Sequence, residues 1–326
     1  MSHHDLSRRD VMAGLSAAGL AAVATPAFAK APLLNTQAPG FYRFKIGAIE
    51  ATVISDGPLE LGAPQPELFK GLTKEEFGKA LTDNFLPTDS FRLEQNALVI
   101  NTGDKLVLID TGTGVQKAFG PHSGKLLSNL KAAGIDPKDI DAVALTHAHP
   151  DHCWGLLGED GAKNFPNAQV YMSEEDFNFW TDVSKAGNND MLKSFVEGTK
   201  KQLLPIRERI EFIKDGQEFI TGIQAISAPG HTVGHTVFMI TSQGKQLCNT
   251  GDLAHHHVVS VEKPRVEFAF DTDGKQGAAT RAKIFGMLAA QRIPIVSYHF
   301  PWPGVGYLAK QGDGFRYYPS PIQTAL

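Results

Sequence analysis

Three histidines and one aspartate occupy six consecutive residues of this 326-residue chain, directly after a short apolar run. The run spans 142–145, and the side chains that follow it are His147, His149, Asp151 and His152. An apolar run of this length predicts a buried β-strand. The polar cluster must then lie in the loop at the end of that strand, so the chain has to fold around a buried sheet that carries a site at its edge.

Three further polar side chains follow apolar runs in the same way. They are His231, Asp252 and His299, and the runs before them span 223–226, 247–248 and 293–296. Strand ends at one edge of a sheet converge, and side chains carried there meet in a cleft. The shared placement predicts that all of these residues belong to one site.

The residue types in this pattern indicate metal chemistry. Neutral imidazole and carboxylate suit zinc, and manganese, iron or cobalt would fit the same ligands. His147 and His149 can face one ion, Asp151 and His152 a second, and the carboxylate of Asp252 can bridge the two. Two metals that share a water give a hydroxide nucleophile at neutral pH. The pattern predicts a two-metal hydrolase with Asp151 and Asp252 as its catalytic carboxylates.

A non-catalytic interpretation of the same residues stays open. The chain has twelve histidines, and isolated histidines usually lie on the surface or make hydrogen bonds in the core. Four candidates within six residues, with three more at strand ends, make coincidence the less favoured interpretation. A periplasmic protein that binds metal without chemistry would need a closed site with no open coordination position.

The rest of the sequence alternates strand-like and helix-like segments, which is typical of an α/β layered domain. No long linker or low-complexity tract interrupts residues 35–326, so a single domain is expected there. The expected strands are 97–100, 105–109, 142–145, 237–240, 246–249 and 293–297. The expected helices lie around 126–130, after Ser173, and over about 280–291.

The N-terminus has the pattern of an export signal. Arg8 and Arg9 precede a stretch rich in Ala, Gly and Leu, and residues 27–29 offer small side chains for cleavage. This is typical of a twin-arginine-type signal peptide over residues 1–29. It predicts a periplasmic protein with no membrane anchor after cleavage, although a disordered start with a chance arginine pair is the alternative.

Charge and cysteine content exclude some partners. The formal charge is −4, with no basic block, which argues against nucleic acid or an anionic membrane surface. The only two cysteines are Cys153 and Cys248, too few for a disulfide framework. A small buried thiol is the favoured role for Cys153, and a bridge between the two cysteines stays open.

The motifs together resemble the metallo-β-lactamase superfamily. Residues 147–152 match its HxHxDH signature, and residues 108–112, Gly230-His231, Gly251-Asp252 and His299 match its other motifs in order. Within the superfamily the chain is similar to methyl parathion hydrolase and its lactonase and aryl-esterase relatives. That likeness shows in residues 38–43, 101–108, 130–134, 165–168 and 230–236. The resemblance implies a four-layer αβ/βα sandwich.

The resemblance also implies roles for individual residues. The implied ligands of metal one are His147, His149 and His231, those of metal two are Asp151, His152 and His299, and Asp252 bridges. Asp110 would orient a ligand histidine, with a plain turn residue as the alternative. His235 would be structural rather than a ligand.

An aromatic substrate pocket is a further implication. Phe119, Trp180 and Phe195 align with pocket rings of the family, and each could equally be core. His255 falls at a pocket-lining position where methyl parathion hydrolase is apolar, or it belongs to a surface run of histidines over 255–257.

The expected reaction is hydrolysis of a small lactone, aryl ester or phosphotriester. A β-lactamase is less favoured, because the bridging Asp252 is not a feature of those enzymes. A glyoxalase-II-type thioesterase is less favoured too, because Cys153 and Trp154 replace the glycine pair after the signature. Relatives suggest a homodimer.

Overall fold

The computed structural model describes residues 31, 33–34, 37–115 and 119–324. The predicted signal peptide lies outside these residues. Residues Pro39 to Leu326 group into one compact unit. In the part of the chain that is described, no helix combines the length and apolar character needed to cross a membrane.

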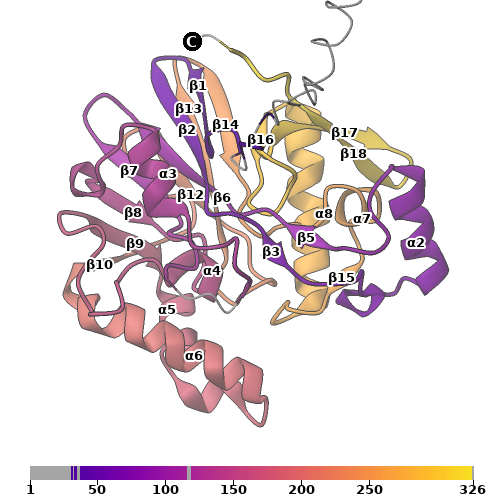
Figure 1. Cartoon of the computed structure of the whole chain (residues 1–326), viewed down its shortest axis with the longest axis horizontal. Coiled ribbons are helices and arrows are strands. Elements are labelled where there is room, and N and C mark those ends of the chain that lie inside the picture. The colour runs from indigo at the N-terminus through magenta and orange to yellow at the C-terminus, as the bar shows by residue number, and fades with distance from the viewer. Residues whose placement is uncertain (1–30, 32, 35–36, 116–118, 325–326) are drawn as a thin grey trace, which may run out of the picture. The chain divides into compact units, whose positions relative to one another are not determined.

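Two seven-stranded sheets form the centre of the fold (Figure 1). The first has the strand order β1 (Phe41–Ile46), β2 (Ile49–Ser55), β6 (Asn96–Asn101), β7 (Leu106–Ile109), β8 (Ala142–Ala144), β9 (Gln169–Ser173), β10 (Ile210–Ile213). The second has the order β11 (Glu218–Ile220), β12 (Ile223–Ser227), β13 (Thr236–Ser242), β14 (Lys245–Asn249), β16 (Ile295–Val296), β17 (Val305–Gln311), β18 (Gly314–Pro319). In the first sheet, β7 pairs in parallel with β8, β8 with β9, and β9 with β10. In the second sheet, β14 pairs in parallel with β16.

The sheets pack face to face because their strands alternate between two apolar surfaces. In β6, Leu98 and Ile100 join a core shared with Phe238 and Ile240 of the second sheet. The intervening Val99 joins the core on the outer face of the first sheet. This alternation gives each sheet an outer face that helices cover, and the predicted four-layer sandwich is confirmed.

Helices cover both outer faces. Beside the first sheet lie α3 (Leu126–Ala132), α4 (Pro150–Cys153), α5 (Glu174–Trp180) and α6 (Asp190–Leu203), and beside the second lie α7 (Val259–Glu262) and α8 (Gly274–Gln291) (Figure 1). Short 3₁₀ turns are η1 (Pro66–Leu68), η3 (Pro137–Asp139), η4 (Val183–Ala186) and η5 (Leu204–Arg209). The expected helix N-cap is present at Ser173, because the Ser173 hydroxyl accepts a hydrogen bond from the Asp176 backbone N–H at 3.1 Å.

Residues 59–93 form an insertion between β2 and β6 that we call the cap. It contains β3 (Leu59–Glu60), β4 (Phe69–Lys70), α2 (Lys74–Asp83) and β5 (Arg92–Leu93), and β4 pairs with β15 (Glu267–Phe268). The cap has its own apolar core, in which Phe69 packs against Phe77 and Phe268. Figure 1 shows α2, β3 and β5 together on the side of the molecule where α7 and α8 lie.

Two expected elements have different bounds. Helix α8 begins at Gly274, six residues before the expected start, because Asp273 caps it by accepting from the Gln276 backbone N–H. Two glycines, Gly274 and Gly277, lower the helix propensity of its first turns, so the sequence did not predict that these turns are helical. The strand expected over 293–297 is shorter in the structure, where β16 spans only Ile295–Val296. Pro294 has no backbone N–H to donate to the sheet, which fits the shorter strand.

Candidate metal centre

The signature residues lie where β8 ends and α4 begins. His149 occupies the N-cap position of α4, and Pro150 fills its first turn, where a missing N–H costs nothing. The bend at this junction presents His147 and His149 from the loop, while Asp151 and His152 come from the short helix. One β-strand therefore positions four of the predicted ligands.

His231 and Asp252 bring the second sheet to the same place. His231 lies in the turn between β12 and β13, and Asp252 follows β14. The turn before His231 needs glycine, because Gly230 has φ +131° and a Cβ there would lie 2.1 Å from the Gly277 nitrogen. The close approach of Gly230 to Gly277 of α8 thus fixes the position of the turn that carries His231.

The first group of ligand atoms is tight. The ligand atoms of His147, His149, His231 and Asp252 all lie within 4.8 Å of one another. The His231 Nε2 atom is 2.9 Å from His149 Nδ1 and 3.2 Å from His147 Nε2. Three imidazole nitrogens thus converge on one point, as the ligands of a single ion do.

A second group adjoins the first through Asp252. The ligand atoms of Asp151, His152 and His299 also lie within 4.8 Å of one another. Asp252 Oδ1 is 3.2 Å from His152 Nε2, and Asp252 Oδ2 is 3.0 Å from His299 Nε2 and 3.3 Å from His231 Nε2. The Asp252 carboxylate therefore faces both groups, which is the arrangement of a bridging ligand.

The buried polar atoms fit two divalent cations. His152 Nε2 and Asp252 Oδ1 are buried, and although they lie 3.2 Å apart neither makes a hydrogen bond within the described residues. Such atoms cost free energy unless something else satisfies them. A set of nitrogen and carboxylate oxygen donors without thiolate suits zinc and similar ions.

Charge reinforces this fit. Burial lowers the pKa of His147 and of His149 well below the usual range, so both rings are neutral and free to act as ligands. Burial alone would raise the pKa of Asp252, but the neighbouring His152 and His299 hold that pKa well below its usual range. The Asp252 side chain is thus a carboxylate at neutral pH, as a bridging ligand would need to be.

Each of three candidate ligand histidines is held through its other ring nitrogen. His152 Nδ1 lies 2.9 Å from Asp110, His231 Nδ1 lies 2.9 Å from Asp271, and His299 Nδ1 lies 2.8 Å from the backbone oxygen of Glu94. Partners of this kind set the tautomer and the direction of a ligand ring. Asp110 thus contacts His152 as expected.

Asp110 holds more than one group. Its carboxylate also accepts from the backbone N–H and the hydroxyl of Thr146, both at 2.8 Å. Asp110 itself has φ +62°, a left-handed conformation that non-glycine residues seldom adopt. The strained backbone directs the carboxylate from the end of β7 toward the loop after β8.

Asp176 joins the two ligand loops. Its carboxylate accepts from the Ala148 N–H at 2.9 Å and from the Gly234 N–H at 2.7 Å. Ala148 lies between His147 and His149, and Gly234 belongs to the turn that follows His231. Burial raises the pKa of Asp176 to about 6 in spite of these hydrogen bonds. One side chain therefore fixes the spacing of the first group of ligands.

Two other expected residues contact Asp252. His235 is buried, and its Nε2 atom accepts from the Asp252 backbone N–H at 3.0 Å. His255 is buried too, which rules out a surface position, and its Nε2 atom lies 3.1 Å from Asp252 Oδ2. The His255 ring stacks on Phe268 with centroids 3.7 Å apart.

A cavity of about 80 Å³ opens above the ligands. Its floor contains His149, Asp151, His231, Asp252 and His299, and its walls include Leu59, Leu61, Leu93, Phe119, Phe195, Phe268 and Phe270. Phe119 and Phe195 thus lie where the pocket was expected. Trp180 does not line this cavity, which corrects its expected place in the pocket.

Trp180 packs behind the site instead. Its ring is 1% exposed and meets the His149 ring edge-on, with centroids 4.7 Å apart. Helix α5 directs it into the core because Trp180 and Phe177 share the buried face of that helix. Cys153 and Cys248 are also buried, and both are free thiols, so the possible bridge is absent.

A family model for the metallo-beta-lactamase superfamily matches residues 91–308. The chain belongs to this superfamily. The match spans the positions of all the candidate ligand residues. The fold and the clustered His and Asp side chains are those expected of a metal-dependent hydrolase of this superfamily.

Similar solved structures cover the whole fold. The hydrolase AbOPH in the beta-lactamase superfamily is 31% identical, with a TM-score of 0.81 over 88% of this chain and 100% of its own. AidC, a dizinc quorum-quenching lactonase in complex with N-hexanoyl-L-homoserine as product, is 29% identical, with a TM-score of 0.82 over 87% and 99%. The likeness to methyl parathion hydrolase stays a prediction.

Curated relatives match shorter stretches. The N-acyl homoserine lactonase AttM of Agrobacterium fabrum is 33% identical over 40% of this chain and 47% of its own length. A beta-lactamase-like protein 2 homolog of Drosophila melanogaster is 29% identical over 44% and 41%. The chain spans about half the length of the curated relatives it matches.

The sequence did not predict three contacts in the site. Asp271 is 40 positions from the histidine it holds, and no motif surrounds it. Asp176 lies in the first turn of α5, where the N-terminal capping pattern of the helix accounted for an acidic residue, so the sequence indicated no second role for it. The Glu94 contact uses a backbone oxygen, which no residue type reveals.

Proposed function

We propose that the chain is a lactonase with a dinuclear metal centre, which opens an uncharged lactone ring and also accepts aryl esters and phosphotriesters. The observation that carries this proposal is the shared Asp252 between two ligand groups that open into an apolar cavity. Zinc is the proposed metal, with manganese, iron or cobalt as alternatives.

When bound, two divalent cations supply Lewis acidity and lower the pKa of a water that becomes the nucleophile. The ligand residues of the two groups would hold them, with Asp252 between. The Asp151 carboxylate lines the cavity and can accept a hydrogen bond from the nucleophile, which holds its lone pair toward the substrate. No serine or cysteine nucleophile is needed.

The cavity favours a neutral substrate. None of the described residues lining it is Lys or Arg, and seven of them are Leu or Phe. A lactone or aryl ester is uncharged and buries well against such walls. A β-lactam or a glutathione thioester carries carboxylates, for which these walls offer no cationic partner. This supports the lactonase over either alternative within the same fold.

The lactonase relatives support the same choice. AidC and AttM carry lactonase names, and AidC covers almost the whole of this chain. A protein that only binds metal is the second class of function, and the open cavity above the ligands argues against it.

A substrate panel tests the proposal. The metal-loaded protein is assayed with dihydrocoumarin, an acyl-homoserine lactone, p-nitrophenyl acetate and methyl paraoxon, beside elemental analysis of bound metal. We expect the two lactones to give the highest kcat/KM. Two bound metals with no turnover of any substrate would favour the metal-binding protein instead.

Export and assembly stay predictions. The twin-arginine-type signal predicts that the mature protein is found in the periplasmic fraction and that replacing Arg8 and Arg9 by lysine retains it in the cytoplasm. A homodimer is the proposed assembly, and light scattering of the purified protein measures it.

A further inference from the structure

The residue between the two ligand histidines of the signature is held on both sides of its backbone. The N–H of Ala148 donates to the Asp176 carboxylate at 2.9 Å, and its carbonyl oxygen accepts from the Thr199 hydroxyl at 3.1 Å. Ala148 is fully buried, so no solvent competes for these bonds. Because His147 and His149 flank Ala148, the position of this residue sets how far apart their rings lie.

Thr199 reaches the ligand loop from α6, which packs beside α4 and α5 (Figure 1). Its hydroxyl is buried and accepts from the indole N–H of Trp154 at 3.2 Å. A threonine hydroxyl in a helix can otherwise donate to a carbonyl of its own preceding turn. The indole N–H can only donate, so it occupies a lone pair of the hydroxyl and polarises the O–H that is directed at Ala148.

A glycine inside α6 makes room for the Trp154 ring. Gly198 lies in the interior of this helix, where glycine lowers helix stability relative to alanine. A Cβ at Gly198 would overlap atoms of the Trp154 ring. Gly198 therefore admits the indole ring, and Thr199 next to it accepts from the ring N–H.

The sequence departs from the family pattern at the same place. Cys153 and Trp154 stand where a glycine pair would follow the signature. Glycine has no side chain that could reach α6, so the bond from Trp154 to Thr199 depends on this departure. The Cys153 thiol adds a weak bond of its own, since it donates to the Ala148 oxygen at 3.4 Å. Both replacing side chains thus act on Ala148, one directly and one through Thr199.

We infer that Trp154 and Thr199 are positioning residues for the first metal ion, and that Trp154 acts through Thr199. Neither side chain supplies a ligand atom or lines the catalytic cavity. Among the described residues, no hydrogen bond joins either side chain to Asp151, His152 or His299, so the second ion does not depend on them. The inference rests on the proposed metal centre, whichever substrate is hydrolysed.

Three variants separate the hydrogen bonds from the packing. Thr199→Val keeps the shape of the side chain and removes the hydroxyl, Thr199→Ser keeps the hydroxyl, and Trp154→Phe keeps an aromatic ring and removes the N–H. Gln202→Met is the matched control. The Gln202 side chain also joins α6 to the segment after α4, by accepting from the Leu157 N–H at 2.8 Å, but makes no hydrogen bond to Ala148. Thermal unfolding establishes that each variant is folded.

Stepwise titration of the metal-free protein with Co²⁺ measures the affinity for each ion, and the visible absorption of bound Co²⁺ reports its coordination geometry. The binding step that His231→Ala abolishes identifies the first ion. We expect Thr199→Val to weaken the first ion roughly tenfold or more and to leave the second within about twofold. Thr199→Ser should restore the wild-type affinity and spectrum. Trp154→Phe should weaken the first ion about fivefold, the effect of one ordinary hydrogen bond.

A double-mutant cycle tests whether Trp154 acts through Thr199. In the Thr199→Val background, Trp154→Phe should weaken the first ion no further, because the indole N–H has already lost its acceptor. Additive losses in the two backgrounds would overturn the inference. So would an unchanged first ion in Thr199→Val, or an equal loss in Gln202→Met, which would reduce the role of α6 to packing. A wild type that binds two Co²⁺ ions but hydrolyses no lactone would count against the lactonase proposal alone.

Discussion

The metal-ligand residues lie at the ends of strands in two seven-stranded sheets, whereas much of the apolar wall above them comes from two-residue strands of the cap. The ligand side chains are buried and held by carboxylates and backbone groups. The side chains of the wall residues Leu59, Leu61 and Leu93 pack against apolar neighbours, and their backbones are held by the β3–β5 pairing and by the hydrogen bond from Leu61 N–H to Phe91 O. We therefore expect the chemistry to depend on the two sheets and substrate choice to depend in part on the cap.

The largest effect is expected where both ligand groups meet. Asp252→Ala removes the carboxylate that faces both groups, so we expect activity to be abolished and bound metal to fall below two equivalents, measured by elemental analysis. Asp104→Ala, in an exposed hairpin turn, is the control. Two metals retained in Asp252→Ala would contradict the bridging assignment.

The second prediction concerns Asp56, at the boundary between β2 and the cap. Its carboxylate accepts from Thr113, Gly124 and Leu126, and burial nevertheless raises its pKa to about 6. Between about pH 4 and pH 6 the folded protein keeps this proton while the unfolded chain releases it. Stability from this group is therefore lost as pH rises through that window.

Asp56→Asn should remove that pH dependence. We expect the free energy of unfolding of the wild type, minus that of the variant, to fall by about 2 kcal/mol between pH 4 and pH 7. Urea unfolding of both proteins at several pH values measures the difference, in which metal dissociation cancels. Parallel curves for the two proteins would show that Asp56 does not titrate there.

The third prediction separates the two ligand groups. Asp110→Asn weakens the hold on His152, and Asp271→Asn weakens the hold on His231, so each should lower the affinity of a different ion by roughly 10–100-fold. Stepwise metal titration of the stripped protein distinguishes the two binding events. If both variants weakened the same ion, the division into two groups would be wrong.

The smallest effect is expected in the wall. Phe195→Ala removes an apolar ring from the catalytic cavity, so we expect KM for aryl esters to rise about tenfold while metal content stays unchanged. Phe179→Ala is the control, because Phe179 is half-buried in the same region but does not line the cavity. A similar rise in both variants would assign Phe195 to packing.

The sequence was informative where local pattern and function coincide. The apolar runs before His147, His231 and His299 predicted strands and the placement of ligands at their ends. Trp180 shows the limit of this reasoning. Its spacing is compatible with a pocket wall or a core position, and only the packing of α5 shows that the ring lies behind His149.

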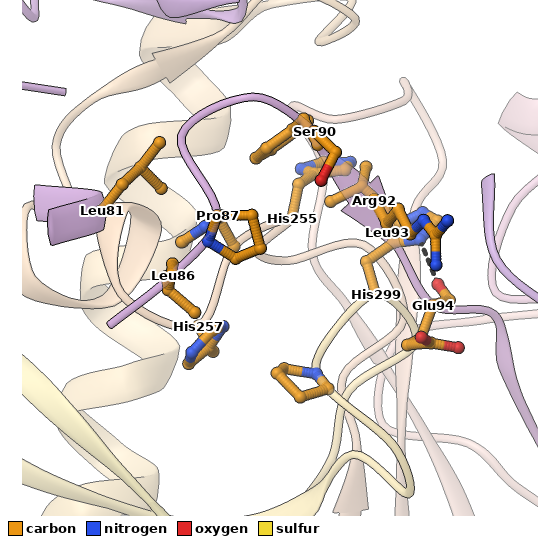
Figure 2. A pocket seen from close by; sticks show the side chains of 13 residues that line it. Leu81, Leu86, Pro87, Ser90, Arg92, Leu93, Glu94, His255, His257 and His299 are labelled. Carbon is orange, nitrogen blue, oxygen red and sulfur yellow. Dashed lines mark hydrogen bonds between the residues drawn. The ribbon is translucent and has the colours of Figure 1, made fainter. Parts of the chain in front are cut away.

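Residue type and periodicity along the chain predicted an α/β domain with clusters of His and Asp at strand ends, and the resemblance to the metallo-β-lactamase superfamily predicted the four-layer sandwich, the candidate ligand set and a metal-dependent hydrolase. Tertiary structure decided which carboxylate holds which histidine, as Asp271 and Asp176 show. It also decided that residues of the cap line a second cavity, which shares Leu93, His255 and His299 with the cavity above the ligands (Figure 2). Both depend on contacts between residues far apart in the chain, and no local pattern encodes such contacts.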